Sequence, residues 1–148
     1  MTKPIFIANW KMNLSLKERE NLANDFKKEL GEIKDRDIVI CPSTVSLISI
    51  ANIIKDSHLQ LGAQNVSHFP EGAYTGVVTA KMLQGLVSYV LIGHSERRKL
   101  LQETNQLVLE KITLCLDNNL SPIVCVSNLD QVKFLKEEFK KENNRKNS

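Results

Sequence analysis

Short apolar runs alternate along this chain with segments in which apolar residues recur every three or four positions. The apolar runs occupy residues 5–8, 38–41, 59–63, 89–93 and 122–126, and the helical segments occupy residues 15–31, 43–55, 79–85, 103–118 and 128–139. Runs that are apolar throughout are typical of strands buried on both faces of a parallel sheet. The alternation therefore predicts a parallel α/β fold with right-handed crossovers.

Local signals indicate where several helices begin and end. Ser15 and Glu18 have the spacing of a capping box, Gly31 stands near the end of that helix, and Asn128 can cap the last one. The second helix is expected to bury Leu47, Ile48, Ala51 and Ile54 on one face. The last helix is expected to bury Leu129, Val132, Leu135 and Phe139.

Length and composition favour one globular domain over residues 1–148, ending in a polar, frayed tail at 142–148. The net charge of +3 is mild, and no basic stripe with interleaved aromatic residues suggests a nucleic-acid partner. The N-terminus lacks the apolar core of a signal peptide, and no run reaches transmembrane length. These features predict a cytoplasmic protein without a membrane partner.

The three cysteines lie within or beside apolar segments and have no CxxC spacing. They are therefore expected to be buried thiols, with no role in a disulfide or a metal site. The cysteines are Cys41, Cys115 and Cys125.

Two architectures fit five parallel βα units. A doubly wound sheet is complete at this length, whereas a closed eight-stranded barrel typically needs roughly 250 residues, so the pattern alone favours the doubly wound sheet. The chain has neither a GxGxxG nor a GxxxxGK[ST] motif, so no nucleotide cofactor is indicated.

Polar residues follow two of the predicted strands, where parallel α/β proteins bind ligands. His94 comes directly after the fourth strand and before a helix N-terminus, whose partial positive charge favours a neutral imidazole that donates a hydrogen bond. Asn9 and Lys11 follow the first strand, and in an extended chain their side chains point the same way. On spacing alone, a loop-capping histidine and a solvated lysine remain alternatives.

Four motifs together resemble the triosephosphate isomerase family, in its order and spacing. They are ANWKMN at 8–13, GAQN at 62–65, GAYTG at 72–76 and YVLIGHSERR at 89–98. The resemblance extends to about Val126 and implies the first five βα units of an eight-unit barrel. It displaces the doubly wound interpretation and predicts a partial TIM-type barrel.

The resemblance implies an isomerase of glycolysis and gluconeogenesis that interconverts dihydroxyacetone phosphate and glyceraldehyde 3-phosphate through an enediolate, without metal or cofactor. His94 would be the electrophile, Lys11 would stabilise negative charge, Asn9 would position the substrate, and Glu96 would hold Lys11. Arg98 would pair with Glu103. The resemblance further implies a homodimer in which Thr75, on the long loop at 64–76, reaches a neighbouring subunit.

Several departures from the family pattern concern catalysis. The chain has no Ala-Tyr-Glu-Pro motif, which carries the family's general base, and no counterpart of the seventh and eighth units, which grip the phosphate. Glu71 and Glu103 are the nearest carboxylates by position, but neither follows a strand end. Val77 replaces an acid after Thr-Gly, and residues 127–128 replace Gly-Glu after the fifth strand.

Three interpretations follow. The first is a truncated triosephosphate isomerase, inactive or weak alone, that associates with itself or with a complementing chain supplying the last three units. The second is a non-catalytic remnant that acts as an oligomerising half-barrel. The third is a small α/β domain that binds an anionic metabolite. The motifs favour the first.

Overall fold

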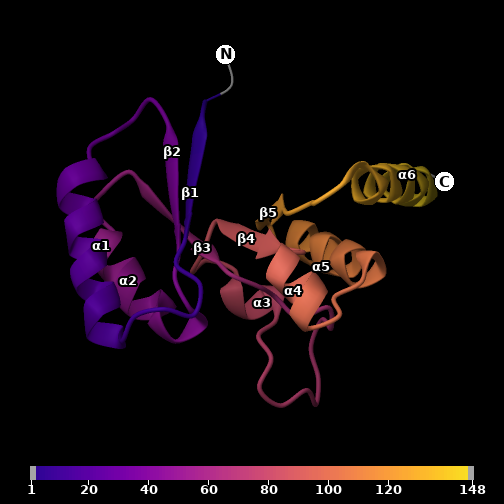
Figure 1. Ribbon diagram of the computed structural model, residues 1–148, viewed down its shortest axis with the longest axis horizontal. Helices are drawn as coiled ribbons and strands as arrows, with labels where there is room; N and C mark the ends of the chain where they lie inside the picture. Colours follow the sequence, from indigo (N-terminus) through magenta and orange to yellow (C-terminus); the bar gives the residue numbers. More distant parts are fainter. Residues whose placement is uncertain (1–2, 147–148) are drawn as a thin grey trace.

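The computed structural model describes the backbone of residues 3–146 and the side chains of residues 3–141. Strands and helices alternate as the sequence predicts (Figure 1). The elements are β1 (Ile5–Asn9), α1 (Leu16–Leu30), β2 (Asp37–Cys41), η1 (Thr44–Ser46), α2 (Leu47–Ile54), β3 (Leu59–Ala63), α3 (Ala80–Leu83), β4 (Tyr89–Ile92), α4 (Ser95–Leu100), α5 (Asn105–Asp117), β5 (Ser121–Val124) and α6 (Leu129–Lys146).

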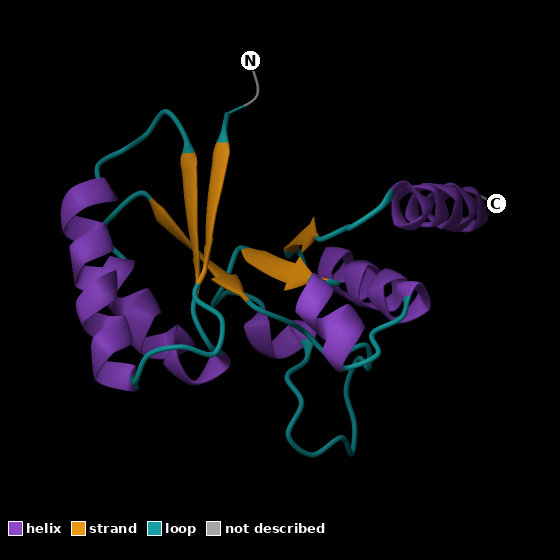
Figure 2. Ribbon diagram, in the orientation of Figure 1, coloured by secondary structure: helices purple, strands orange, loops and turns teal. Residues whose placement is uncertain are grey.

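The five strands form one parallel sheet in the order β1-β2-β3-β4-β5. A doubly wound sheet reverses its strand order near the middle, whereas a barrel wall adds each strand beside the previous one. The strand direction turns strongly from β1 to β5, so that the sheet curls as the wall of a barrel does (Figure 2). The fold is therefore a partial TIM-type barrel of five βα units, and the doubly wound alternative is wrong.

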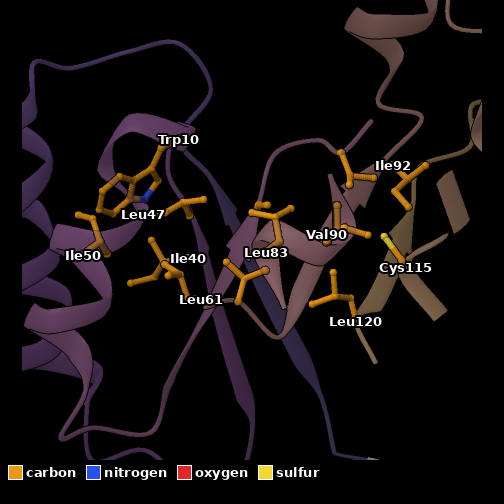
Figure 3. Close-up of a cluster of buried hydrophobic side chains, with 14 of the residues drawn as sticks. Trp10, Ile40, Leu47, Ile50, Leu61, Leu83, Val90, Ile92, Cys115 and Leu120 are labelled. Carbon is orange, nitrogen blue, oxygen red and sulfur yellow. The ribbon is translucent and has the colours of Figure 1, made fainter. Parts of the chain in front are cut away.

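The main core lies between the sheet and its helices (Figure 3). Ile40 of β2 and Val90 and Ile92 of β4 belong to it and are fully buried. The alternate residues Val39 and Leu91 belong to a smaller cluster with Cys41, Tyr89, Ile123 and Cys125. Because side chains alternate along a strand, this second cluster is on the concave face, which becomes the interior of a closed barrel.

Helix capping follows the sequence signals. Ser15 and Glu18 form a reciprocal capping box at the start of α1, where the Ser15 amide donates to Glu18 Oε2 at 2.7 Å. Asn128 Oδ1 accepts from the Gln131 amide at 3.0 Å at the start of α6. The predicted buried thiols are also found, with Cys41 and Cys115 buried and Cys125 half-buried.

Four local expectations are wrong. The second helical segment opens with the 3₁₀ turn η1, so the buried face of α2 carries Leu47, Ile50 and Ile54 while Ile48 is exposed. The helix N-terminus predicted after His94 is confirmed, but it begins a separate short helix, α4, which precedes α5 and adds to the five helices expected. In α6, Leu135 is buried but Leu129 and Val132 are exposed.

The fourth concerns the tail. α6 continues through Lys146, beyond the point where fraying was expected, while residues 147–148 lie outside the described part.

Candidate active site

The carboxyl ends of the strands open into a hollow of about 550 Å³, here called the rim pocket. All four candidate site residues, Asn9, Lys11, His94 and Glu96, line it. The other lining residues are Met12, Ser43, Thr44, Gln64, Asn65, Arg97, Leu100 and Leu101. The topology thus brings together groups from the ends of β1, β2, β3 and β4, as expected for a parallel barrel wall.

The turn after β1 places Lys11 in the rim pocket. Lys11 has a φ of 55°, so the chain is not extended there, contrary to the sequence expectation. Its amide donates to Asn9 Oδ1 at 3.0 Å, and its carbonyl accepts from Gln64 Nε2 at 2.9 Å. A left-handed conformation in a non-glycine residue costs about 1–2 kcal/mol, so these two hydrogen bonds hold a strained turn at the site.

An ion pair orients the Lys11 side chain. Its Nζ lies 2.6 Å from Glu96 Oε1, the pair that the resemblance implies. The hydrogen bond from Lys11 is the main cause that lowers the pKa of Glu96, so this carboxylate stays ionised at neutral pH. Glu96 therefore fixes a cation at the mouth of the rim pocket.

His94 is the N-cap of α4, and its Nδ1 accepts from the Glu96 amide at 3.3 Å. Glu96 Oε2 also lies 3.4 Å from Nδ1. The amide N–H can only donate, so it requires an unprotonated Nδ1 and places the proton of the neutral ring on Nε2. In the neutral ring, Nε2–H is therefore the group that can donate a hydrogen bond.

Gly93 allows the sharp turn from β4 into α4. Its φ is 71°, and a Cβ at this position would lie 2.8 Å from Arg98 Nη2 and 2.9 Å from Val108 Cγ2. A side chain would therefore meet both strain and close contacts. This glycine fixes where His94 leaves the sheet.

The predicted pair between Arg98 and Glu103 is wrong. Arg98 Nε donates to the Gly93 carbonyl at 2.7 Å, and Nη1 donates to Asn105 Oδ1 at 2.7 Å. Glu103 Oε2 instead accepts from Arg97 Nε at 2.6 Å. The two arginines are adjacent on α4 and so point in different directions, which exchanges the partners expected from the sequence.

Glu103 and Lys111 form a buried ion pair that the sequence analysis missed. Lys111 Nζ donates to Glu103 Oε2 at 2.8 Å and to Asn65 Oδ1 at 2.9 Å. Burial raises the pKa of Glu103, but the hydrogen bonds from Lys111 and Arg97 outweigh it, so the net shift is downward. The signal available was a lysine placed between Val108 and Ile112 on an apolar face.

Gln64 was also missed as a functional residue, although it lies in one of the motifs. Its Nε2 donates to the carbonyls of Lys11 and Cys41, both at 2.9 Å. It therefore ties the turn after β1 to the end of β2 across the rim pocket.

The two carboxylates that the sequence offered as alternative bases are both held by cations. Glu71 pairs with Lys81 at 2.9 Å, and Glu103 is neutralised by Arg97 and Lys111. Neither carboxylate lines the rim pocket.

Within the described residues, no group of three or more His, Cys, Asp or Glu could hold a metal ion. No helix in the same part of the chain is long and apolar enough to cross a membrane.

Comparison with known proteins identifies the family. The protein-family model described as "Triosephosphate isomerase" matches residues 4–145 of this chain. The chain belongs to the triosephosphate isomerase family. It is 45% identical over 126 residues to the triosephosphate isomerase of Dehalococcoides mccartyi (strain CBDB1), covering 85% of this chain and 50% of that protein.

Other members of the triosephosphate isomerase family give the same result. The protein from Alkaliphilus oremlandii (strain OhILAs) is 42% identical, covering 85% of this chain and 51% of its own length. The protein from Clostridium botulinum (strain Loch Maree / Type A3) is 44% identical, covering 84% and 50%. The chain thus spans about half the length of these relatives.

Proposed function

We propose that this chain supplies the electrophilic part of an isomerase site that interconverts dihydroxyacetone phosphate and glyceraldehyde 3-phosphate. The observation that carries the proposal is the placement of His94, Lys11 and Asn9 around one pocket, with His94 Nδ1 accepting an amide N–H. Membership of an isomerase family supports this reaction class. No step of the proposed reaction uses a metal or a cofactor.

The proposed roles follow from where charge develops. Removal of a proton from the carbon beside the carbonyl transfers electrons to the oxygen and produces an enediolate. His94 Nε2–H would donate to the two substrate oxygens, as is established for the neutral histidine of this family. The Lys11 ammonium would stabilise the negative charge, and Asn9 would position the substrate. One well-placed donor of this kind contributes about 10²–10³ in rate.

The proposed site needs groups that this chain does not contain. The sequence has no Ala-Tyr-Glu-Pro motif. Glu96, the carboxylate among the residues that line the rim pocket, is paired with Lys11. Absence of a general base costs about 10²–10⁴ in rate. We therefore propose that a segment other than residues 1–148 supplies the glutamate base and the phosphate-binding loops.

We also propose that the loop at 64–76 contacts a second subunit, as the family resemblance implies for a homodimer. The loop between β3 and α3 protrudes from the rest of the chain (Figure 1). Phe69 and Tyr74 stack with ring centroids 3.8 Å apart, which stiffens the loop below the exposed Thr75. The resemblance to glycolytic enzymes supports a cytoplasmic location.

A coupled assay with glyceraldehyde 3-phosphate tests whether this chain lacks part of the site. We expect no turnover above background from the folded chain alone, and no difference between it and the His94→Gln variant. Turnover that His94→Gln abolishes would show that a base is found within the chain or its homo-oligomer, and the complementation proposal would then be wrong.

A further inference from the structure

A buried arginine near the start of α1 has no carboxylate partner. Arg19 is 8% exposed, and it forms no ion pair within the part of the chain that the structure describes. The adjacent Glu18 is exposed and accepts from Ser15 instead. A buried charge without a counter-charge is costly, and a cation near a helix N-terminus also opposes the helix dipole. The contacts of the Arg19 guanidinium must therefore offset this cost.

The guanidinium joins two segments that follow different strands. Because α1 and α2 lie side by side, a side chain of α1 can reach the start of α2 (Figure 2). Arg19 Nε donates to the carbonyl of Asn13, in the turn after β1, at 3.1 Å. Its Nη1 donates to Ser46 Oγ, at the end of η1, at 3.1 Å in a buried contact. The donors of a guanidinium lie in one rigid plane, so Arg19 holds the turn after β1 at a fixed position beside η1.

The turn that Arg19 holds is strained on both sides of Asn13. Lys11 has a φ of 55° and Leu14 has a φ of 70°, so both lie in the left-handed region. Each such residue costs about 1–2 kcal/mol, so the turn keeps this shape only where its surroundings fix it. The two hydrogen bonds described above fix the Lys11 end of the turn. The contact with Arg19 fixes the other end.

Both of the segments that Arg19 joins contribute residues to the rim pocket. Lys11 and Met12 come from the turn, and Ser43 and Thr44 come from the start of η1. Arg19 is not among the residues that line the pocket. Its influence on the pocket therefore passes through the two segments.

We propose that Arg19 is a positioning residue of the rim pocket, which holds the turn after β1 against η1 and so sets where the Lys11 ammonium lies. The inference rests on the proposed function for the use of that placement, because Lys11 is proposed there to stabilise the enediolate. The placement itself can be measured without turnover. Lys11 Nζ lies 2.6 Å from Glu96 Oε1, and this hydrogen bond is the main cause that lowers the pKa of Glu96.

An NMR titration of the carboxyl carbons measures the pKa of Glu96 in the folded chain, and Glu96→Gln assigns its signal. Arg19→Lys keeps the charge but loses the planar fork of donors, and Arg19→Met removes both. Lys11→Met gives the pKa of Glu96 without the ion pair. The matched control is Lys17→Met, which removes an exposed charge from the same helix.

Glu18 is an internal reference in the same titration. The hydrogen bond from the Ser15 side chain is the main cause that lowers its pKa, so a general loosening of α1 would raise it. His94 also lowers the pKa of Glu96, and it is present in every variant. The two carboxyl groups therefore separate a change in the turn from a change in the helix.

We expect both Arg19 variants to raise the pKa of Glu96 toward its value in Lys11→Met, and Lys17→Met to leave it unchanged. Arg19→Lys should leave the pKa of Glu18 unchanged, which distinguishes lost geometry from lost charge. An unchanged pKa of Glu96 in the folded Arg19 variants would overturn the proposal, because the turn would then keep its shape without them. A joint rise for Glu18 and Glu96 in Arg19→Lys would also overturn it, because Arg19 would then act only on the stability of α1.

Ser46→Ala carries the test if circular dichroism shows that the Arg19 variants do not fold. The Ser46 side chain makes no capping hydrogen bond to α2, so this change removes one acceptor of Arg19 and leaves the other. The pKa of Glu96 should then rise by less than in Lys11→Met, and an unchanged value would overturn the proposal. No outcome depends on isomerase activity. A chain that supports no turnover can still show the coupling, and its absence does not contradict the proposed reaction.

Discussion

The buried pair of Glu103 and Lys111 gives the sharpest prediction for stability. Their side chains are 3% and 4% exposed, and their charged atoms are 2.8 Å apart. Glu103→Gln removes one charge and leaves the Lys111 ammonium buried beside a neutral amide. Breaking a buried ion pair in this way costs about 3–5 kcal/mol, because the remaining charge is uncompensated. Arg97 also loses its partner, but it is partly exposed, so water can solvate it.

Urea unfolding followed by circular dichroism measures this loss as a difference in free energy of unfolding. The matched control is Glu71→Gln, which breaks the pair with Lys81 at 2.9 Å, where the side chains are 70% and 67% exposed. Exposed pairs contribute about 0–1 kcal/mol, so the control should be nearly neutral. If the folded chain has less than the predicted loss to spare, Glu103→Gln will show no folded baseline.

A second comparison separates the ion pair from the shape of the site. The double variant Glu103→Leu with Lys111→Met removes both charges, and such replacements are often neutral or stabilising by about 1–4 kcal/mol. It should therefore be more stable than Glu103→Gln. A Glu103→Gln loss no larger than that of the Glu71→Gln control would refute the reasoning, because it would mean that Lys111 reaches water in the folded chain.

Three further predictions follow from individual residues. The pKa of Glu103 is lowered on folding, so ionised Glu103 contributes to the free energy of unfolding. This contribution is fully present above the unfolded pKa of about 4.3 and is lost as the pH falls through the lower folded value. Urea midpoints should therefore drop over that acid range, and a flat profile that matches Glu103→Gln would contradict this. Burial raises the pKa of Cys41 and Cys115 to about 12, so at pH 8 their thiolate fraction is about 10⁻⁴. Iodoacetamide should therefore modify them only after unfolding, which mass spectrometry can measure. Rapid labelling of the folded chain would show that the sheet opens. Gly93→Ala should lower the free energy of unfolding, measured in urea, by about 2–4 kcal/mol. The loss should exceed that of Gly85→Ala, because Gly85 has a similar φ of 79° but no atom within 4 Å of an added Cβ. Equal losses would show that backbone strain alone acts at Gly93.

Local rules were enough to predict much of the fold. The capping box of Ser15 and Glu18 and the cap at Asn128 involve residues three positions apart, so their partners are visible in the sequence. The apolar runs predicted all five strands, because a parallel strand leaves a continuous apolar signal, even though β1 and β5 are only partly buried here. The choice between a barrel wall and a doubly wound sheet needed the family motifs, since both architectures have the same alternation.

Contacts between distant elements could not be read in this way. Which of two adjacent arginines meets Glu103 depends on the rotation of the short helix α4, which local sequence patterns do not determine. The burial of Lys111 depends on Asn65 and Glu103 converging from other segments. The turn at Lys11 likewise depends on Gln64, 53 positions away in the sequence.

Exposed apolar residues on α6 and β1 have a related cause. The periodicity of α6 predicted a buried stripe that includes Leu129 and Val132, and that stripe requires a following strand to cover it. The sequence pattern reports the surface that a helix can bury. Only the structure reports how much of that surface has a partner within this chain.

The most direct test of the central claim is reconstitution of isomerase activity. This chain is mixed with a polypeptide that carries the last three βα units of the Dehalococcoides mccartyi relative, and conversion of glyceraldehyde 3-phosphate is followed in a coupled assay. We expect neither polypeptide to be active alone, the mixture to be active, and His94→Gln in this chain to abolish the activity. A complex that forms by mass but shows no turnover, or turnover that His94→Gln leaves unchanged, would contradict the claim that this chain supplies the electrophilic half of the site.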